Sequence, residues 1–333
     1  MISILLPFKD AEGTLLACLS SILAQSYPHF EIIAVDDHSS DDSANLVRQY
    51  PDCRIRSVKN QGNGLIPALN CGLSVCQYPY VARMDADDLM RPNRLATQLA
   101  HFRRIPELTL SGSRVSLFSK TPLRAGYIEY ISWQNAVLCH TDIRNQIYVE
   151  SPFAHPSVMF KKDAVLNVGG YEEGDFPEDY DLWLKLFSAG HQMEKLSQTL
   201  LDWREAPIRE SRTNPRYRRE AFDRLRARYL SRDNRIIPSN RPISIWGAGR
   251  KTRLRARWLL DLGIRLSNWI DIDPKKIGNV INGIQVISPQ SLNNLKEKLF
   301  VLIYVTNHGA RDDISSYLDS IGYCGGKDYL AVG

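Results

Sequence analysis

The most constraining feature of the sequence is a set of three aspartates directly after an apolar segment. Residues 80–84 predict a short strand, and Asp85, Asp87 and Asp88 follow it. Pro92 then opens a run with apolar residues at helical spacing, which predicts a helix. Carboxylates at the end of a buried strand repel one another unless a cation or hydrogen-bond donors lie beside them. A hard divalent ion, Mg²⁺ or Mn²⁺, shared with substrate phosphates would suit such a strand end, and the alternative is an acidic loop in water.

Strand and helix patterns alternate through the first half of the chain. This alternation predicts an α/β fold with a mostly parallel sheet and helices on both faces. Ligands of such sheets bind beyond the carboxyl ends of the strands, where Asp10, Asp36 and Asp37 also fall. Strands are expected at residues 2–6, where Pro7 ends the strand, and at 31–35, 55–59, 80–84 and 108–113, with helices at 15–25 and 65–75 and from Pro92.

The following segment contains a second group of polar candidates. Residues 114–149 show no regular pattern, and a loop with His155 leads into a strand expected at 157–160. A lone histidine is more often structural than catalytic. A helix begins at Pro177, and its first turn is acidic, with Glu178, Asp179 and Asp181. Acids in a first turn are commonly explained by the helix dipole, and the functional alternative is a rigidly held general base.

Composition restricts the class of protein. The chain has 333 residues, enough for two domains, and 44% hydrophobic and 24% charged residues, as in ordinary globular proteins. The formal net charge of +5 is too small to indicate a nucleic-acid partner. The first residues predict a strand and no signal peptide, and no apolar run is long enough to span a bilayer. The six cysteines are scattered and predict reduced thiols in a cytoplasmic protein.

Five segments together resemble one known family. The first 205 residues resemble the inverting family 2 glycosyltransferases, which have the GT-A fold. The matching segments, in the order of the family, are I-S-I-L-L-P-F-K-D, E-I-I-A-V-D-D-H-S-S-D-D-S, Y-V-A-R-M-D-A-D-D, A-H-P-S-V-M-F and E-D-Y-D-L-W-L. The resemblance implies an enzyme that moves a sugar from a nucleotide-diphosphate donor to a glycan or lipid-linked acceptor, in polysaccharide biosynthesis.

The resemblance also implies a role for individual residues. Asp37 matches the acid that binds the donor base, usually uracil, and Pro7, Phe8 and Asp10 lie on the same side. Asp10 marks a departure, because Lys9-Asp10 replaces the usual Tyr-Asn, so UDP is only the default donor nucleotide. The remaining implied roles are the D-x-D motif with Asp85 at the ribose and diphosphate and Asp87 on the metal (Mn²⁺ or Mg²⁺), Arg204 at the diphosphate, Asp179 as the catalytic base, and His155 and Glu178 on the acceptor side.

Two other functions fit parts of the pattern. A sugar-nucleotide pyrophosphorylase shares such a sheet, but residues 7–13 are a poor version of its glycine-rich basic loop. A non-catalytic nucleotide-sugar-binding protein would not need Asp85, Asp87 and Asp179 together. Free UDP release in the presence of Mn²⁺ would distinguish the transferase from both.

The rest of the chain predicts a connector and a second domain, so that we expect domains at 1–205, 206–238 and 239–333. The connector is rich in arginine, and a helix is expected at 215–230. This helix is either a solvated link or a basic face for anionic lipid. The second alternative would give a peripheral contact at the inner face of the membrane. The second domain is Rossmann-like. Gly247 and Gly249 follow a strand at 243–246, and Asp271 ends the next one. Thr252 replaces the third glycine, so an NAD-type nucleotide and a structural or docking role both stay open, and we expect no chemistry there. The helix after Gly249 has a basic face (Arg250, Lys251, Arg253, Arg255 and Arg257) that would suit an anionic partner or solvent.

Overall fold

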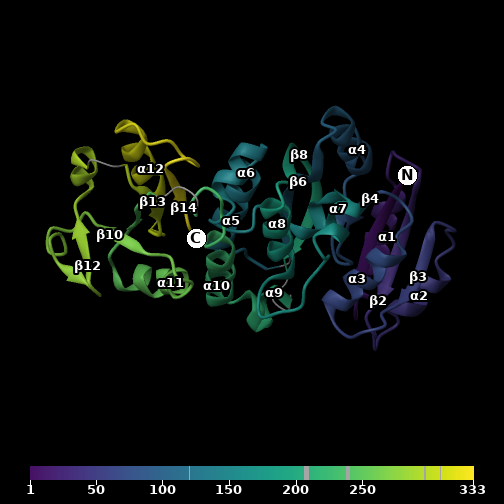
Figure 1. Cartoon of the computed structure of the whole chain (residues 1–333). Coiled ribbons are helices and arrows are strands. Elements are labelled where there is room, and N and C mark those ends of the chain that lie inside the picture. The colour runs from purple at the N-terminus through teal and green to yellow at the C-terminus, as the bar shows by residue number, and fades with distance from the viewer. Residues whose placement is uncertain (120, 206–209, 238–240, 296–297, 308) are drawn as a thin grey trace. The chain divides into compact units, whose positions relative to one another are not determined.

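The structure, a computed structural model, describes the chain apart from residues 120, 206–209, 238–240, 296–297 and 308 (Figure 1). Two compact units form. The first contains residues 1–143 and 151–214, and the second contains residues 144–150 and 215–333. The boundary expected between the connector and the second domain, at residues 238–239, and the first residues of the expected connector lie outside the described residues.

The first unit is built on one sheet of eight strands. The strand order is β3-β2-β1-β4-β7-β6-β8-β5, in which β7 is antiparallel to both of its neighbours, β5 is antiparallel to β8, and the other neighbours are parallel. The mostly parallel α/β sheet predicted from the sequence is therefore confirmed. The strands are β1 (Ile2–Phe8), β2 (Phe30–Asp36), β3 (Ile55–Lys59), β4 (Tyr80–Arg83), β5 (Leu89–Met90), β6 (Leu108–Ser119), β7 (Met159–Lys161) and β8 (Gln192–Glu205).

Helices cover both faces of this sheet because side chains alternate along each strand. Ile4 and Leu6 of β1 are fully buried in a core cluster that includes Leu19 and Leu99 of two covering helices. On the opposite face, Gly72 of a third helix lies so close to β1 and β2 that an added Cβ would collide with their side chains. The helices of this unit are α1 (Leu15–Leu23), α2 (Ser43–Gln49), α3 (Leu65–Val75), α4 (Arg94–Arg104), α5 (Ala125–Ala136), α6 (His140–Gln146), α7 (Lys162–Asn167), α8 (Glu178–Ser188) and α9 (Glu210–Thr213).

Pro7 does not end β1, as the sequence suggested, but lies inside it and pairs with Val35 of β2. The carbonyl of Leu5 accepts a hydrogen bond from Met84 on the β4 side, and successive residues point alternately to the two neighbours. The N–H that proline lacks would therefore point toward the β4 side, and the pairing with β4 ends at Arg83. Because β4 no longer pairs with β1 at Pro7, the missing backbone N–H costs little hydrogen-bond energy.

The structure also differs from the expected pattern in the second half of this unit. Residues 114–149 are not irregular, because β6 continues to Ser119 and is followed by α5 and α6. The strand expected at 157–160 begins later, since residues 155–157 form a short 3-10 turn before β7. Strand β8 was not predicted at all. Its buried and exposed positions follow no simple alternation, because its pairing with β6 contains register shifts.

The second unit has its own parallel sheet in the order β11-β12-β10-β9-β13-β14, with only the β11–β12 pair antiparallel among the described strands. This is the smaller α/β domain that the sequence predicts, although β11, β12 and β14 were not predicted. The strands are β9 (Ile243–Trp246), β10 (Leu266–Ile270), β11 (Val280–Ile281), β12 (Ile284–Ile287), β13 (Phe300–Ile303) and β14 (Tyr329–Ala331), and the helices are α10 (Arg219–Leu230), α11 (Arg250–Asp261) and α12 (Ala310–Ser320).

Helix α10, which we expected in a separate connector, is part of the second unit. Its Asp223 forms an ion pair of 3.0 Å with Arg255 of α11, and Arg226 adds a second bond to the same carboxylate. Both arginines are less than a tenth exposed. The solvated basic helix is therefore only partly correct, since buried ion pairs use some of its charges. Among the described residues, no helix has the length and hydropathy that a bilayer-spanning segment needs.

Candidate functional site

The three aspartates after β4 form one cluster. Asp85, Asp87 and Asp88 each offer a carboxylate oxygen, and these oxygens lie within 4.8 Å of one another. Asp88 is buried, and the other two are partly accessible. Carboxylate oxygens at this spacing are the ligand type that Mg²⁺ and Mn²⁺ prefer. The acidic cluster therefore fits a divalent ion, and Asp85 and Asp87 are its accessible members.

Two buried arginines, Arg83 and Arg94, partly compensate the negative charge of the three aspartates. Arg83, only 2% exposed, forms an ion pair with Asp85. Burial disfavours the charged form of Arg83, but the attraction of the Asp85 carboxylate is stronger, so the pKa of Arg83 is raised. Arg94 is fully buried and donates hydrogen bonds of 2.8 and 3.1 Å to the carbonyls of Arg83 and Val158. Burial lowers the pKa of Arg94 to about 9, while Asp88 acts in the opposite direction.

Arg204, at the end of β8, lies against the same loop. Its backbone N–H donates to Asp88 at 2.7 Å, and its Nε donates to the carbonyl of Asp87 at 2.7 Å. Its guanidinium stacks over Phe118 at 4.4 Å. The short strand β5 follows the aspartates and pairs with β8, which explains why a residue more than a hundred positions away reaches this loop. The structure therefore places a cation beside the acidic cluster.

Asp179 lies in the first turn of α8, directly after Pro177 and Glu178. Its carboxylate accepts a hydrogen bond of 2.7 Å from the backbone N–H of Tyr180. Burial, followed by the neighbouring Glu178 carboxylate, raises the pKa of Asp179 to about 8. A carboxylate with a raised pKa binds a proton more tightly than an ordinary aspartate does, and this is the property that a general base requires.

His155 is enclosed by other side chains. Its Nε2 lies 2.8 Å from the hydroxyl of Tyr171, and its ring meets Trp183 edge to face at 5.9 Å. Its Nδ1 is 4.0 Å from Glu178, beyond hydrogen-bond distance. Burial, with a smaller effect of Arg83, holds the pKa of His155 well below its usual range, so the ring is neutral. His155 and Glu178 thus lie next to Asp179, but as packed groups.

Asp37 stands at the end of β2, in a network of donors. One carboxylate oxygen accepts bonds from Asn60 Nδ2 at 2.6 Å and from the Gly64 N–H at 2.9 Å, and the other lies 3.9 Å from Lys9 Nζ. Sequence reasoning overlooked Asn60 and noted Lys9 only as part of a departure from the family pattern. A signal was present, since Asn60 directly follows the predicted strand 55–59 just as Asp37 follows 31–35.

The other residues assigned to the donor side are placed differently. Asp10 is exposed, has a left-handed φ of 47°, and accepts hydrogen bonds of 2.7 and 3.0 Å from the N–H and hydroxyl of Ser40. These bonds join the loops after β1 and β2, and they lower the pKa of Asp10. Phe8 is 4% exposed and packs in the core cluster, and Pro7 is buried within β1.

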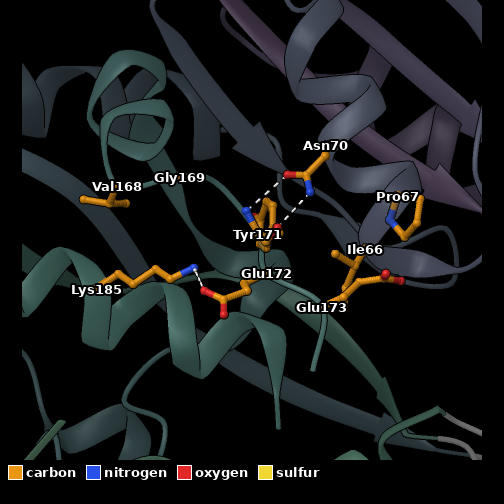
Figure 2. Close-up of a pocket in the computed structure, with 9 residues that line it drawn as sticks. All are labelled: Ile66, Pro67, Asn70, Val168, Gly169, Tyr171, Glu172, Glu173 and Lys185. Atoms are coloured by element: carbon orange, nitrogen blue, oxygen red, sulfur yellow. Dashed lines mark hydrogen bonds and ion pairs between the residues drawn. The ribbon is translucent and has the colours of Figure 1, made fainter. Parts of the chain in front are cut away.

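A pocket of about 410 Å³ opens between α3, the loop after α7, and α8 (Figure 2). The backbone N–H of Tyr171 donates to the side-chain oxygen of Asn70 on α3 at 3.1 Å. The side-chain amide of Asn70 donates to the backbone carbonyl of Tyr171 at 2.8 Å. Lys185 of α8 forms an ion pair of 2.8 Å with Glu172 on the other wall. The hydroxyl of Tyr171 contacts His155, which in turn lies beside Glu178, so one chain of contacts joins this polar pocket to the start of α8.

In the second unit, Gly247 begins the predicted glycine-rich turn with a φ of 114°. A Cβ there would lie 2.9 Å from the hydroxyl of Thr252, the residue that replaces the third glycine. Asp271 does not extend freely from the end of β10, because its carboxylate accepts bonds from the Ala248 N–H at 2.9 Å and from Lys276 at 3.1 Å. Gly249 precedes α11 and has an ordinary extended backbone. In this structure Asp271 stabilises the turn itself.

Comparison with known proteins identifies the family. A sequence model described as glycosyl transferase family 2 matches residues 3–169, half of the chain. The chain belongs to this family. The glycosyltransferase is 32% identical over 198 residues to the "Amylovoran biosynthesis glycosyltransferase AmsE" of Erwinia amylovora, covering 58% of this chain and 71% of the relative.

A second relative comes from Escherichia coli and carries a more specific name. It is the "UDP-Gal:alpha-D-GlcNAc-diphosphoundecaprenol beta-1,3-galactosyltransferase", 33% identical over 201 residues, which cover 59% of this chain and 70% of the relative. A crystal structure of S. aureus TarS with UDP-GlcNAc matches with a TM-score of 0.57 at 15% identity, covering 78% of this chain and 71% of that one. The structural match shows a shared fold. The family, the fold class and the enzyme class expected from the sequence are confirmed, which favours the glycosyltransferase over the two alternatives.

The buried arginine beneath the cluster gives a prediction about stability. We expect Arg83→Gln to lower the free energy of unfolding of the glycosyltransferase by about 3 kcal/mol, because the variant leaves the carboxylate of Asp85 without its buried partner. Chemical denaturation without added metal measures this loss. Arg91→Gln is the matched control, since Arg91 forms an exposed ion pair with Asp202 at 2.7 Å and its loss should cost less than about 1 kcal/mol. Equal losses in the two variants would contradict the role given to Arg83.

Proposed function

We propose that the enzyme transfers a sugar from a UDP-sugar to a lipid-linked or glycan acceptor, with inversion at the anomeric carbon and Asp179 as the general base. One observation carries the proposal: the first unit contains both an acidic cluster suited to a divalent ion and a separate aspartate with a raised pKa. A single displacement needs these two functions, one at the leaving group and one at the acceptor hydroxyl.

The donor nucleotide is proposed to bind at the ends of β1 and β2. Asp37 would accept a hydrogen bond from the N–H of uracil through the carboxylate oxygen that faces Lys9, since Asn60 and Gly64 occupy the other oxygen. The E. coli relative is named for a UDP-sugar donor, which supports the same nucleotide here. Pro7 and Phe8, the last residues of β1, would shape the nucleotide site, and Asp10 would hold the adjoining loops together.

The diphosphate is proposed to lie over the acidic cluster. Asp85 and Asp87 would hold Mn²⁺ or Mg²⁺, because their oxygens are accessible and close together. A bound divalent ion supplies positive charge to the departing diphosphate. Arg204 contributes a second positive charge at the same place, and its bonds to the backbone of the cluster fix its position before the donor arrives.

The acceptor is proposed to approach from the side of α8. Asp179 removes the proton from the attacking hydroxyl as the new bond between that oxygen and the anomeric carbon forms. The bond between the anomeric carbon and the diphosphate breaks in the same step, and UDP leaves with the bonding electrons. Attack opposite the leaving group inverts the configuration. Glu178 and His155 would position Asp179, since Glu178 raises its pKa and His155 packs beside Glu178.

The acceptor is proposed to be lipid-linked, and the enzyme to work in the cytoplasm at the inner face of a membrane. The E. coli relative is named for a diphosphoundecaprenol-linked acceptor, and AmsE for polysaccharide biosynthesis. We propose no chemistry for the second unit. Gly247, Gly249 and Asp271 could still contact an NAD-type nucleotide, although the bonds from Ala248 and Lys276 to Asp271 favour a structural turn.

Replacement of the base tests the mechanism. We expect Asp179→Asn to keep donor binding nearly unchanged and to reduce sugar transfer by about 100-fold or more, the usual contribution of general base catalysis. UDP release during transfer measures the rate, and calorimetry measures donor affinity. Asp175→Asn is the control, because Asp175 is exposed in the loop just before α8. Transfer within a few-fold of wild type would exclude Asp179, and His155 would become the next candidate.

The raised pKa of Asp179 predicts a pH dependence. The base works only when it is deprotonated, so kcat/KM should rise with pH through the pKa of about 8 and fall about tenfold for each pH unit below it. Initial rates between pH 5.5 and pH 9 measure this limb. An aspartate with an ordinary pKa would be deprotonated throughout that range. A rate that stays flat down to pH 5.5 would contradict the assignment.

The acidic cluster predicts metal-dependent donor binding. Asp87→Asn should abolish the increase in UDP affinity that Mn²⁺ causes, because the variant removes one of the two accessible carboxylates. Calorimetric titration of UDP with Mn²⁺ and with EDTA measures the difference. Asp202→Asn is a suitable control, since Asp202 lies on β8 near the same loop but pairs with Arg91. An unchanged Mn²⁺ effect in Asp87→Asn would contradict the metal site.

A further inference from the structure

The second unit contains a hollow of about 500 Å³ along one side of α11. Its walls come from the helix, from β10 and from the tight turn between β11 and β12. The turn is Asn282-Gly283, in which both residues have a left-handed φ, of 50° and 77°. Such a two-residue turn is rigid and holds the Asn282 side of the hollow in place. Arg250, which directly follows Gly249 of the glycine-rich turn, lines the hollow, whereas Gly247 does not.

Three arginines of α11 line the hollow: Arg250, Arg253 and Arg257. They recur at helical spacing and so share one side of the helix. Arg257 pairs loosely with Asp261 at 3.9 Å, and both side chains are more than half exposed. Among the residues that the structure describes, Arg250 and Arg253 have no ion-pair partner. The hollow therefore has a surplus of positive charge.

Two buried donors at the hollow also lack acceptors. Arg253 Nε and Trp269 Nε1 have no hydrogen-bond partner within the described part of the chain. Trp269 lines the hollow from β10, although it is only 1% exposed. A buried N–H without an acceptor costs free energy. Both atoms are enclosed by protein, so a ligand in the hollow would meet the accessible parts of Arg250, Arg253 and Arg257.

The simplest alternative is a basic helix face in water. Lys251 is such a residue, because it is exposed on α11 and does not line the hollow. Arg255 is different again, because it is buried in its ion pair with Asp223. A solvated face would not need a hollow. It would also leave unexplained why Leu254, which is 53% exposed, lines the same hollow.

We propose that this hollow binds a phosphate or diphosphate ester. The guanidinium groups of the arginines would contact its oxygens, and Leu254 would pack against the apolar part of the ligand. The same chemistry is offered by a soluble diphosphate and by the headgroup of an anionic lipid. The hollow is built by residues of the second unit alone, and the inference does not depend on the mechanism proposed for the first.

The test compares the full-length chain with two matched variants. Inorganic diphosphate is titrated by calorimetry in EDTA, which withholds metal from the aspartates of the first unit. Sedimentation with phosphatidylglycerol vesicles, against phosphatidylcholine vesicles, tests the lipid source. We expect Arg253→Gln to weaken binding by about tenfold or more, and Lys251→Gln to weaken it by less than about twofold, although both remove one charge from α11. Arg250→Gln, an exposed position, replaces Arg253→Gln if that variant does not fold.

Each outcome decides the matter. Saturable diphosphate binding with this ranking supports a soluble ligand, and the same ranking with vesicles alone supports a lipid headgroup. Equal weakening in Arg253→Gln and Lys251→Gln would reduce the hollow to a generally basic surface and overturn the proposal. Absence of binding to both probes would overturn it as well.

Discussion

A buried cation beneath three aspartates is the interaction on which the transfer site depends. Asp85, Asp87 and Asp88 repel one another at the end of β4, and Asp88 is also buried, so positive charge nearby stabilises the cluster. Arg83, itself buried, supplies that charge from the strand that ends at the cluster. This arrangement leaves the charge of the cluster only partly compensated, and Asp85 and Asp87 stay partly accessible, so the cluster suits a divalent ion.

Distant parts of the chain are joined to this loop by backbone pairing. Strand β5 follows the aspartates directly and pairs with β8, and this pairing brings Arg204 to the carbonyl of Asp87. The acceptor side is built separately. There α8 presents Asp179 at its first turn, and the contacts from Tyr171 to His155 connect that turn to the pocket beside α3. In the proposed mechanism, leaving-group chemistry and acceptor chemistry thus rest on different elements of the first unit.

The sequence predicted most of what depends on local pattern. The parallel strands and the aspartates at their ends follow from apolar runs with polar ends, so Asp37 and the cluster after β4 could be located directly. The strand β8 could not, because its shifted register with β6 hides its alternation. Likewise, Asn60 and Arg83 act through contacts with Asp37 and Asp85 that only the fold creates. Burial, too, had to be seen, because it lowers the pKa of His155 and raises the pKa of Asp179.

The stereochemistry of transfer tests the central claim most directly. If Asp179 deprotonates the acceptor hydroxyl for one in-line displacement, the sugar of an α-linked nucleotide donor must become β-linked in the product. Proton NMR of the product formed from a UDP-α-sugar and a diphosphate-linked acceptor reports the anomeric configuration through its coupling constant. The account predicts a β-linked product. An α-linked product would require two displacements or attack from the same face, and it would contradict the role given to Asp179.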